Sequence, residues 1–440
     1  MKDFAGYELT GANAASLALL EQGFHELRCY VGDPVTTVER ALEAAPELVM
    51  AHVLRAYLHL LGTEPTAVPV AREAHRNGAA LPATDREKRH LLAIDNIVEG
   101  RWRSAARVLE DLSIDYPLDA LALQAGQLVD FFTGDSRMLR DRLARALPAW
   151  NRSIPGYHAV LGMYAFGLEE TGDYRNAEVH GRSSVELEPR DGWGYHAVAH
   201  VMEMQGRRRD GIAWLRGTAG QWSPESFFAV HNWWHLALFH LGVDEIDEVL
   251  ALFDGPIFGE RPDIVLEMID ASAMLWRLHL RGVDVGNRWA RLADKWEPIA
   301  GAGNYAFNDM HAMMAFVGAG RHSAGRTVLE AQRIAMDAHG DNALFTREVG
   351  HAATRAILAF GEGDYAQTVE LLRPIRSYAH RFGGSHAQRD LIDLTLIEAA
   401  TRSGNERLAK ALVAERTAVK SSAPAARAVP DVRDMTFAAA

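Results

Sequence analysis

The sequence is poor in cysteine, in long apolar runs and in strand-like patterns, and each shortage excludes a class of protein. Cys29 is the only cysteine in 440 residues, which excludes an intrachain disulfide framework and a cluster of thiolate zinc ligands. No stretch reaches the apolar length that a membrane-spanning helix needs, and no convincing run alternates apolar and polar residues as a half-buried strand does. The chain is therefore expected to be a helical, soluble protein of a reducing compartment.

Basic charge and cofactor motifs are also lacking. The net charge of −12 argues against nucleic acid or an anionic membrane as the main partner, because both attract a basic surface. Residues 1–20 lack a basic start followed by an unbroken apolar run, so we expect no signal peptide and a cytoplasmic location. The sequence has no phosphate loop, no dinucleotide-binding glycine motif and no nucleophile elbow, so no organic cofactor is expected.

Glycines recur along the chain at the ends of apolar segments. Successive spacings run from 30 to 43 residues, and two of them are 34 residues. A second amphipathic segment follows each glycine, as expected where a left-handed residue without a β-carbon ends a helix. The glycines of this ladder are Gly32, Gly62, Gly100, Gly134, Gly172, Gly206, Gly242, Gly282, Gly320 and Gly363.

A period near 34 residues, with a glycine turn between two helical segments, is typical of tetratricopeptide repeats. We therefore predict an all-α protein, a right-handed α-solenoid of about ten tetratricopeptide-like helical hairpins, with an unrelated all-α bundle as the alternative. Residues 1–416 form one superhelical domain in this interpretation, and its repeats at about 190–400 form a pocket. The segment 417–440, rich in Ala and Pro, is expected to be a tail or an arm.

The central repeats carry histidines at helical spacing. In HAVAHVMEM, the side chains of His196, His200 and Glu203 fall on one face of a helix, and HNWWHLALFH repeats the histidine pattern with His231 and His235. Two histidines four residues apart occur in zinc sites, although neither stretch has the H-E-x-x-H form. Three interpretations stay open: acid–base catalysis, core packing, and a divalent metal held by His196, His200 and Glu203.

Further polar residues and tryptophans accompany these histidines. Asp270 lies on a predicted helix of the next repeat, and Asn308, Asp309 and His311 follow in FNDMHAMMAF. Asn308 and His311 share a helix face, whereas Asp309 points elsewhere, so helical geometry alone does not bring all three into one pocket. Five of the ten tryptophans fall within residues 193–234, where they line a small-molecule pocket or fill gaps between helices.

These motifs resemble the family of tetratricopeptide repeat protein thirty-eight, found in bacteria and animals. The resemblance covers roughly residues 190–400, through HAVAHVMEM, HNWWHLAL, MLWRLHLRGVDVGNRW, FNDMHAMMA and LLRPIRSYAHRFGGSHAQRD, and the preceding half fits as generic repeats. It implies an α-solenoid of a bacterial member, and no settled reaction. The residues at its motif positions are His196, His200, Glu203, His231, Asn232, Trp234, His235, Asp270, Asn308, Asp309, His311, Arg389 and Asp390.

Two functions of different classes fit the pattern. We favour binding and transformation of a small polar molecule in a concave pocket, by hydrolysis or a lyase reaction, with His200 and His235 as the acid–base pair. Asp309 and His311 are then expected to orient the substrate. The expected lining residues are Trp193, His196, Glu203, His231, Asn232, Trp233, Trp234, Asp270, Asn308 and Arg389.

The alternative function is a peptide- or protein-binding scaffold without catalysis. Peptide-binding repeat grooves typically offer spaced Lys, Arg and Asn side chains, whereas this chain concentrates His, Trp and acidic residues in a few repeats. Self-association into a homo-oligomer stays open under both functions.

Overall fold

The structure, a computed structural model, describes residues 1–259 and 263–420. These ranges contain no β-strand, only two isolated β-bridges. Their α-helices, α1 to α23, pair along the chain into eleven hairpins, because α19, the π-helix η5 and α20 continue one another as one helix. The predicted all-α solenoid of about ten hairpins is therefore confirmed.

The helices follow one another with short connections. Those of the first five hairpins are α1 (Ala14–Cys29), α2 (Pro34–Ala44), α3 (Val49–Leu60), α4 (Val68–Ala79), α5 (Asp85–Val98), α6 (Trp102–Asp115), α7 (Ala120–Phe132), α8 (Ser136–Ala146), α9 (Tyr157–Glu170) and α10 (Tyr174–Leu187). Those of the remaining hairpins are α11 (Gly192–Met204), α12 (Arg208–Trp222), α13 (Ala229–Gly242), α14 (Ile246–Leu252), α15 (Val265–Leu280), α16 (Arg288–Trp296), α17 (Ala306–Gly318), α18 (His322–Asp337), α19 (Asp341–Phe345), α20 (His351–Gly361), α21 (Tyr365–Ile375), α22 (His386–Arg402) and α23 (Glu406–Val419). Short 3-10 and π segments complete the set: η1 (Pro65–Ala67), η2 (Leu147–Ala149), η3 (Phe253–Ile257), η4 (Glu297–Ile299), η5 (Thr346–Gly350) and η6 (Arg376–Phe382).

The glycine ladder builds most of the turns between paired helices. Eight of its ten glycines adopt a left-handed backbone. Gly62 and Gly242 do not, and the left-handed residues of those turns are Thr63 and Asp244, with φ of 58° and 61°. Gly242 has another reason to be glycine, because a β-carbon there would lie 2.4 Å from Cδ of Arg208. The ladder therefore marks ten of the eleven turns between paired helices, although two of its glycines serve the turn differently from the prediction. In the turn of the last hairpin, between α22 and α23, the left-handed residue is Gly404, which is not part of the ladder.

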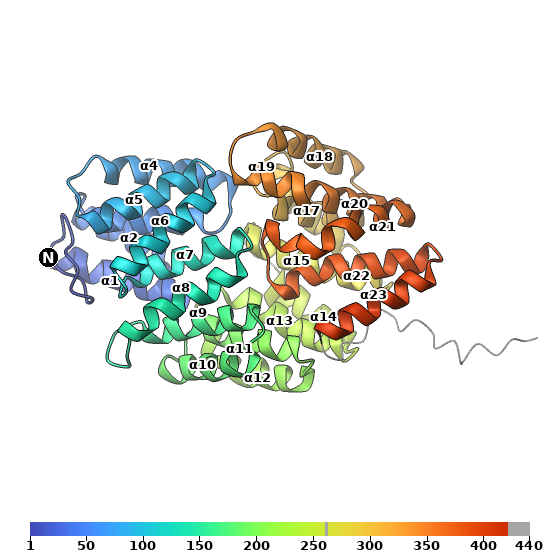
Figure 1. The fold of residues 1–440 in the computed structure, drawn as a ribbon, viewed down its shortest axis with the longest axis horizontal. Coiled ribbons are helices and arrows are strands. Elements are labelled where there is room, and N and C mark those ends of the chain that lie inside the picture. Colours follow the sequence, from blue (N-terminus) through green and yellow to red (C-terminus); the bar gives the residue numbers. More distant parts are fainter. Residues whose placement is uncertain (260–262, 421–440) are drawn as a thin grey trace, which may run out of the picture.

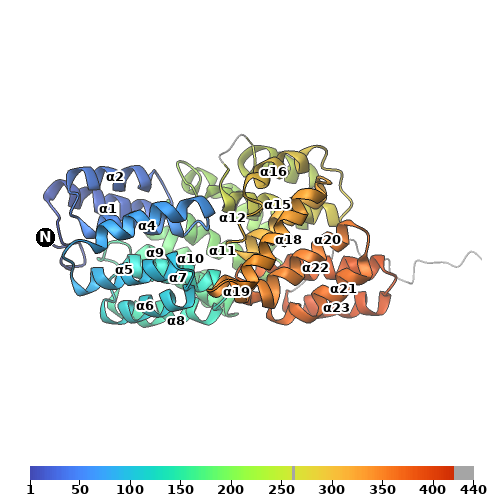
Figure 2. The same ribbon diagram turned by 90° about the horizontal axis from the view of Figure 1, so that it is seen from above.

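The solenoid curves so tightly that hairpins far apart in the sequence touch. Figures 1 and 2 show the N-terminal hairpins in blue and the C-terminal hairpins in orange and red, with the central hairpins joining them. The backbone N–H of Asp341 donates to the carbonyl of Gly100 at 2.8 Å, and the hydroxyl of Tyr305 donates to the carbonyl of Phe132 at 3.0 Å. The first helices of many hairpins consequently face a shared interior.

Two further expectations concern membranes and the C-terminal segment. None of the helices in the described ranges is long and apolar enough to cross a membrane. The predicted tail at 417–440 begins inside the last turn of α23, and the side chain of Lys420 after it is buried. Residues 421–440 lie outside the described part of the chain.

Candidate functional site

Four imidazoles from two neighbouring helices meet in the interior. His196 and His200 project from α11, and His231 and His235 project from α13, each pair from one helix face. One ring nitrogen of each histidine lies within 4.8 Å of the corresponding nitrogens of the other three. His200 and His235 have no exposed surface, and His196 has 2%. We call these four residues the histidine cluster.

Local contacts hold α11 in the position that the cluster needs. Asp191 caps this helix, because its Oδ1 accepts hydrogen bonds from the backbone N–H groups of Trp193 and Gly194 at 3.1 and 3.2 Å. Its Oδ2 accepts from Nδ1 of His158 at 2.8 Å and from the hydroxyl of Ser184 at 2.9 Å. A β-carbon on Gly194 would lie 2.8 Å from that hydroxyl oxygen, so glycine lets α10 and α11 approach. The start of α11 is thus tied to α9 and α10.

Asn232 ties α13 to the same place. Its Nδ2 donates to the carbonyl of Gly192 at the start of α11, at 3.0 Å. Asn232 was expected to line the pocket, and its amide instead joins the two helices that carry the histidine cluster. The i,i+4 pattern of each helix then turns both histidine pairs toward each other.

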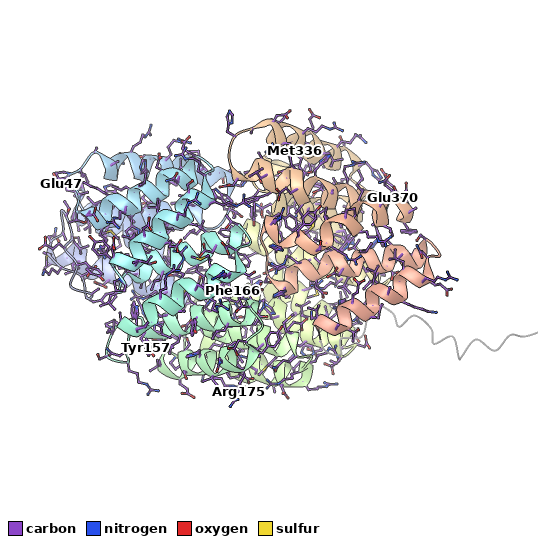
Figure 3. All side chains as sticks on the ribbon, viewed as in Figure 1. Glu47, Tyr157, Phe166, Arg175, Met336 and Glu370 are labelled. Carbon is purple, nitrogen blue, oxygen red and sulfur yellow. The ribbon has the colours of Figure 1, made fainter. Side chains whose placement is uncertain are left out.

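Aromatic rings surround the histidine cluster. The ring of Trp193 lies 4.8 Å from that of His196, and Trp234 stacks on His231 at 5.3 Å. Phe166 of α9 lies 5.4 Å from His196, and Figure 3 labels it near the middle of the view. Trp233 points elsewhere and packs 4.7 Å from the ring of Trp222. Two of the three expected tryptophans therefore wall the cluster.

The ring nitrogens of the histidine cluster have almost no hydrogen-bond partners. Both nitrogens of His196, His200 and His235 lack one among the described residues, whereas Nδ1 of His231 bonds Oδ2 of Asp270 at 2.7 Å. A buried polar atom without a partner costs about 1–3 kcal/mol, so six such nitrogens cost on the order of 10 kcal/mol. That is comparable with the whole stability of a typical domain. A core with this cost is expected to serve a function.

Burial keeps these imidazoles neutral. Desolvation lowers the pKa of His200 to about 3, and it lowers the pKa of His196 and His235 well below the ordinary value, with the neighbouring histidines adding to the effect. A general acid or base works best when its pKa lies near the working pH. His200 and His235 are thus poorly matched to the expected acid–base role, whereas a neutral imidazole keeps a lone pair that it can donate.

Two carboxylates at the end of α9 adjoin the histidine cluster, and the sequence interpretation missed both. Oε2 of Glu169 lies 3.4 Å from Nδ1 of His200, and neither oxygen of this fully buried side chain has a hydrogen-bond partner. Burial raises the pKa of Glu169 well above its usual range, and the adjacent Glu170 adds to the rise. The pair stands in YAFGLEETG, where two glutamates before a glycine turn resemble the ordinary polar end of a helix.

A cleft lies next to these carboxylates. An oxygen of Glu170 accepts from the backbone N–H of His386 at 2.8 Å, and the other accepts from Nη2 of Arg389 at 3.2 Å. Burial acts to raise the pKa of Glu170, but Arg389 and His386 outweigh it and the pKa is lowered. His386 and Arg389 line a cleft of about 800 Å³ between the start of α8, η6, α22 and α23. Arg389 is the expected pocket residue that lines this cleft.

The polar residues of α17 face other parts of the molecule. Oδ2 of Asp309 accepts from Nε2 of Gln332 on α18 at 3.3 Å, and burial raises the pKa of Asp309 to about 7. Nδ1 of His311 lies 2.8 Å from a backbone carbonyl of its own helix. Nδ2 of Asn308 donates to Oγ1 of Thr63, in the turn after α3, at 3.2 Å. No described contact joins these residues to the histidine cluster, because successive helical residues point in different directions.

Glu203 belongs to an ion-pair network at the end of α11. Its Oε1 lies 2.7 Å from Nζ of Lys420, which also lies 3.2 Å from Oδ2 of Asp390. Arg416 donates to both oxygens of Asp390, at 2.6 and 2.7 Å. Burial acts to raise the pKa of Glu203, but the nearby Lys420 outweighs burial and the pKa is lowered. Glu203 therefore helps dock α23 onto α11 and α22, and its place beside His200 is taken by Glu169.

A second group of ligand atoms surrounds the single cysteine. Sγ of Cys29 lies 3.8 Å from Nδ1 of His25 and 4.0 Å from Nε2 of His158. The other nitrogen of His158 bonds Asp191, as described above. These polar atoms have hydrogen-bonding neighbours, so the group lacks the unpaired state that distinguishes the histidine cluster.

The fold and the site together define an α-solenoid with a buried polar centre. No family model matches the chain. It is similar to the crystal structure of yeast Tom70, with a TM-score of 0.32 and 13% identity, covering 93% of this chain and 92% of that one. It is also similar to the crystal structure of the P58(IPK) TPR domain, with a TM-score of 0.20 and 12% identity, covering 90% of this chain and 99% of that one. The paired helices of this chain by themselves show that it is an α-solenoid.

Proposed function

We propose that this protein binds and transforms a small polar molecule at the boundary between the cleft and the histidine cluster. The observation that carries the proposal is a continuous chain of polar groups that leads from the partly exposed residues of the cleft to buried residues of the interior. Arg389 and His386 line the cleft and hold Glu170, and Glu169 beside it lies next to His200. Hydrolysis or a lyase reaction fits this chain, because neither needs an organic cofactor.

The contacts suggest a role for each part of the chain. Arg389 and His386 are the groups that would hold a carboxylate or phosphate of the ligand, since both line the cleft and carry N–H groups. Glu169 would exchange a proton with the ligand, because both of its oxygens are unpaired. In this proposal Glu169 replaces the pair His200 and His235 as the acid–base group.

A scaffold that binds a peptide along the concave surface is the second candidate. The inner helices pack against one another across the interior: Nε1 of Trp276 on α15 donates to Oγ1 of Thr395 on α22 at 2.9 Å. Arg277 likewise donates to the carbonyl of Ala387 at the start of α22. A peptide in the groove would have to separate these helices, so we rank this function below small-molecule binding.

The proposal includes membership of the family of tetratricopeptide repeat protein thirty-eight, as a bacterial protein, and a cytoplasmic location. Its support is that the motif residues of the resemblance contain all four members of the histidine cluster, together with Asp270, which holds His231. The location is supported by a single thiol that stands within hydrogen-bonding reach of histidines and forms no disulfide.

Thermal unfolding with small anions tests the proposal. The wild type is heated alone and with acetate, citrate or inorganic phosphate, and we expect at least one anion to raise Tm by several degrees. Arg389→Gln, and separately His386→Gln, should lose most of the rise. Arg333→Gln is the matched control, because Arg333 forms an exposed pair with Glu330 far from the cleft residues. The proposal is wrong if no probe shifts the wild type, or if both cleft variants respond as the control does.

A further inference from the structure

We propose that the histidine cluster is a transition-metal site, in which His196, His200, His231 and His235 together hold one divalent ion. The inference goes beyond the proposed function, because ion binding does not depend on what enters the cleft. It rests on three observations: four converging donor atoms, their unpaired state, and the carboxylates behind two of the rings.

The donor atoms already lie close to the arrangement that an ion needs. Imidazole nitrogens bind zinc at about 2.0–2.1 Å, so a tetrahedral ion requires nitrogens roughly 3.4 Å apart. The four nitrogens here lie within 4.8 Å of one another, and small rotations of the rings close that gap. Imidazole suits zinc, iron, nickel and copper, whereas magnesium and calcium prefer oxygen ligands. The ion is therefore expected to be a first-row transition metal.

The unpaired nitrogens distinguish an ion from plain packing. Each imidazole can offer one lone pair to an ion, and no described residue donates a hydrogen bond to the ring nitrogens of His196, His200 and His235. Apolar side chains of similar size would fill the same space among the surrounding tryptophans without that cost. A cation accepts all four lone pairs at once, so it explains why imidazoles stand where apolar side chains would be more stable.

Carboxylates stand behind two of the rings, as they do at many metal sites. Nδ1 of His231 donates to Asp270 at 2.7 Å, which fixes the ring and turns Nε2 toward the cluster. Nδ1 of His200 faces Oε2 of Glu169 at 3.4 Å, so its Nε2 also remains free for the ion. Zinc sites also expand to five ligands, and Glu169 is the neighbouring group that could supply the fifth.

The first experiment measures metal content in the full chain, purified without chelator and without an affinity histidine tag. We expect close to one equivalent of zinc, iron, nickel or copper per chain. His235→Leu should reduce the content at least tenfold. His311→Leu is the matched control, because His311 is also buried beside an aromatic ring but lies outside the cluster, and it should keep the ion. Cys29→Ser should keep it too, which rules out the group around the single cysteine as the binding site.

The second experiment needs no variant and covers the case in which His235→Leu does not fold. Metal-free wild type is loaded with Zn²⁺ and its X-ray absorption fine structure is recorded. We expect about four nitrogen or oxygen neighbours at about 2.0–2.1 Å, with the outer-shell scattering of several imidazoles. A wild type that takes up none of Zn²⁺, Co²⁺, Ni²⁺ or Fe²⁺ overturns the inference. A loaded ion without imidazole scattering also overturns the inference. In the first experiment, loss of the bound ion in Cys29→Ser overturns it as well.

These outcomes are separable from those of the proposed function. A bound ion with no anion-dependent rise in Tm supports the metal site and contradicts the small-molecule function. An anion-dependent rise in Tm of a protein that binds no metal supports the small-molecule function and contradicts the metal site.

Discussion

Two groups of buried histidines in this molecule, one in the N-terminal hairpins and one in the histidine cluster, have different surroundings. In the N-terminal hairpins His90 is fully buried, and its Nε2 bonds Oδ2 of Asp119 at 3.0 Å while its Nδ1 lies 3.2 Å from the hydroxyl of Tyr57. In the histidine cluster, His200 and His235 are equally buried, and neither nitrogen of either ring has a hydrogen-bond partner in the described part of the chain. Burial alone therefore does not distinguish the two groups, whereas the absence of a hydrogen-bond partner at both ring nitrogens does.

The carboxylates of the two regions differ in the same way. Asp119 accepts hydrogen bonds from His90, from Arg86 and from the backbone N–H of Ala122. Burial acts to raise its pKa, but His90 and Arg86 outweigh it and hold the pKa well below the usual range. Glu169 has no such partners, and its pKa is raised. The paired contacts of the N-terminal network stabilise the fold, whereas Glu169 is left without a hydrogen-bond partner among the described residues, as the proposed function requires.

The largest expected effect breaks the stabilising network. Asp119→Ala removes the acceptor of His90 Nε2, one of the two carboxylates paired with Arg86 and the cap of α7, so it should lower the free energy of unfolding by about 3–5 kcal/mol. Urea unfolding followed by circular dichroism measures the loss. Asp115→Ala, which removes an exposed partner of Arg89, is the control and should cost less than about 1 kcal/mol. A loss for Asp119→Ala no larger than that of the control would mean that the N-terminal network is not stabilising.

The next prediction compares the two kinds of histidine directly, in the presence of a chelator. His90→Leu removes one of the three hydrogen-bond donors of Asp119 and leaves the hydroxyl of Tyr57 without its partner, so it should lower the free energy of unfolding by about 1–3 kcal/mol. His235→Leu removes two nitrogens that have no partner, so the metal-free protein should be unchanged or more stable. Urea unfolding followed by circular dichroism measures the free energy of unfolding of both variants. Equal losses would place the histidine cluster among the stabilising contacts and count against a functional role.

A smaller effect is expected from the carboxylate behind His231. Asp270→Asn keeps the size of the side chain but weakens its hold on Nδ1, so the affinity for Zn²⁺ or Co²⁺ should fall about 10–100-fold. Competition with a chromogenic chelator measures the affinity. Asp263→Asn, at an exposed ion pair with Lys295 just before α15, should leave the affinity unchanged. If both variants bind as the wild type does, Asp270 does not support the site.

Asp309 adds a third case, a buried carboxylate with one partner, Gln332. Burial raises its pKa from 3.8 to about 7, so the folded state holds a proton that the unfolded state releases. The stabilisation that this bound proton contributes is fully present below pH 3.8 and falls as the pH rises from 3.8 through about 7. Above that pH the contribution of Asp309 no longer changes. The slope is at most about 1.4 kcal/mol per pH unit. The difference in unfolding free energy between wild type and Asp309→Asn from pH 5 to pH 8 measures it, and a flat difference would contradict the prediction.

The sequence interpretation succeeded where the information is local. Helical periodicity predicted the hairpins, and the i,i+4 spacing placed His196 with His200 and His231 with His235. It failed where partners come from distant segments. Asp309 and His311 both stand in the motif FNDMHAMMA, yet α17 turns Asp309 toward α18 and His311 toward its own helix. A one-residue change of position turns a side chain by about 100°, so proximity in sequence says little about a shared pocket.

The cleft depends on segments still farther apart. Glu170 ends α9, whereas its partners His386 and Arg389 begin α22. No sequence period relates these positions, because the distance between them is set by the curvature of the whole solenoid. Glu169 was missed for the same reason: its burial comes from helices that pack over the end of α9.

By itself the sequence determined the repeat, the helical class and the pairing of histidines along each helix, because these follow from spacing within one or two turns of backbone. The tertiary structure alone decided that the two pairs meet, that Glu169 and not Glu203 stands beside them, and that a cleft opens at α22. These depend on how α9, α11, α13 and α22 pack across the interior. Packing is fixed by the summed contacts of eleven hairpins, and no single motif contains that sum.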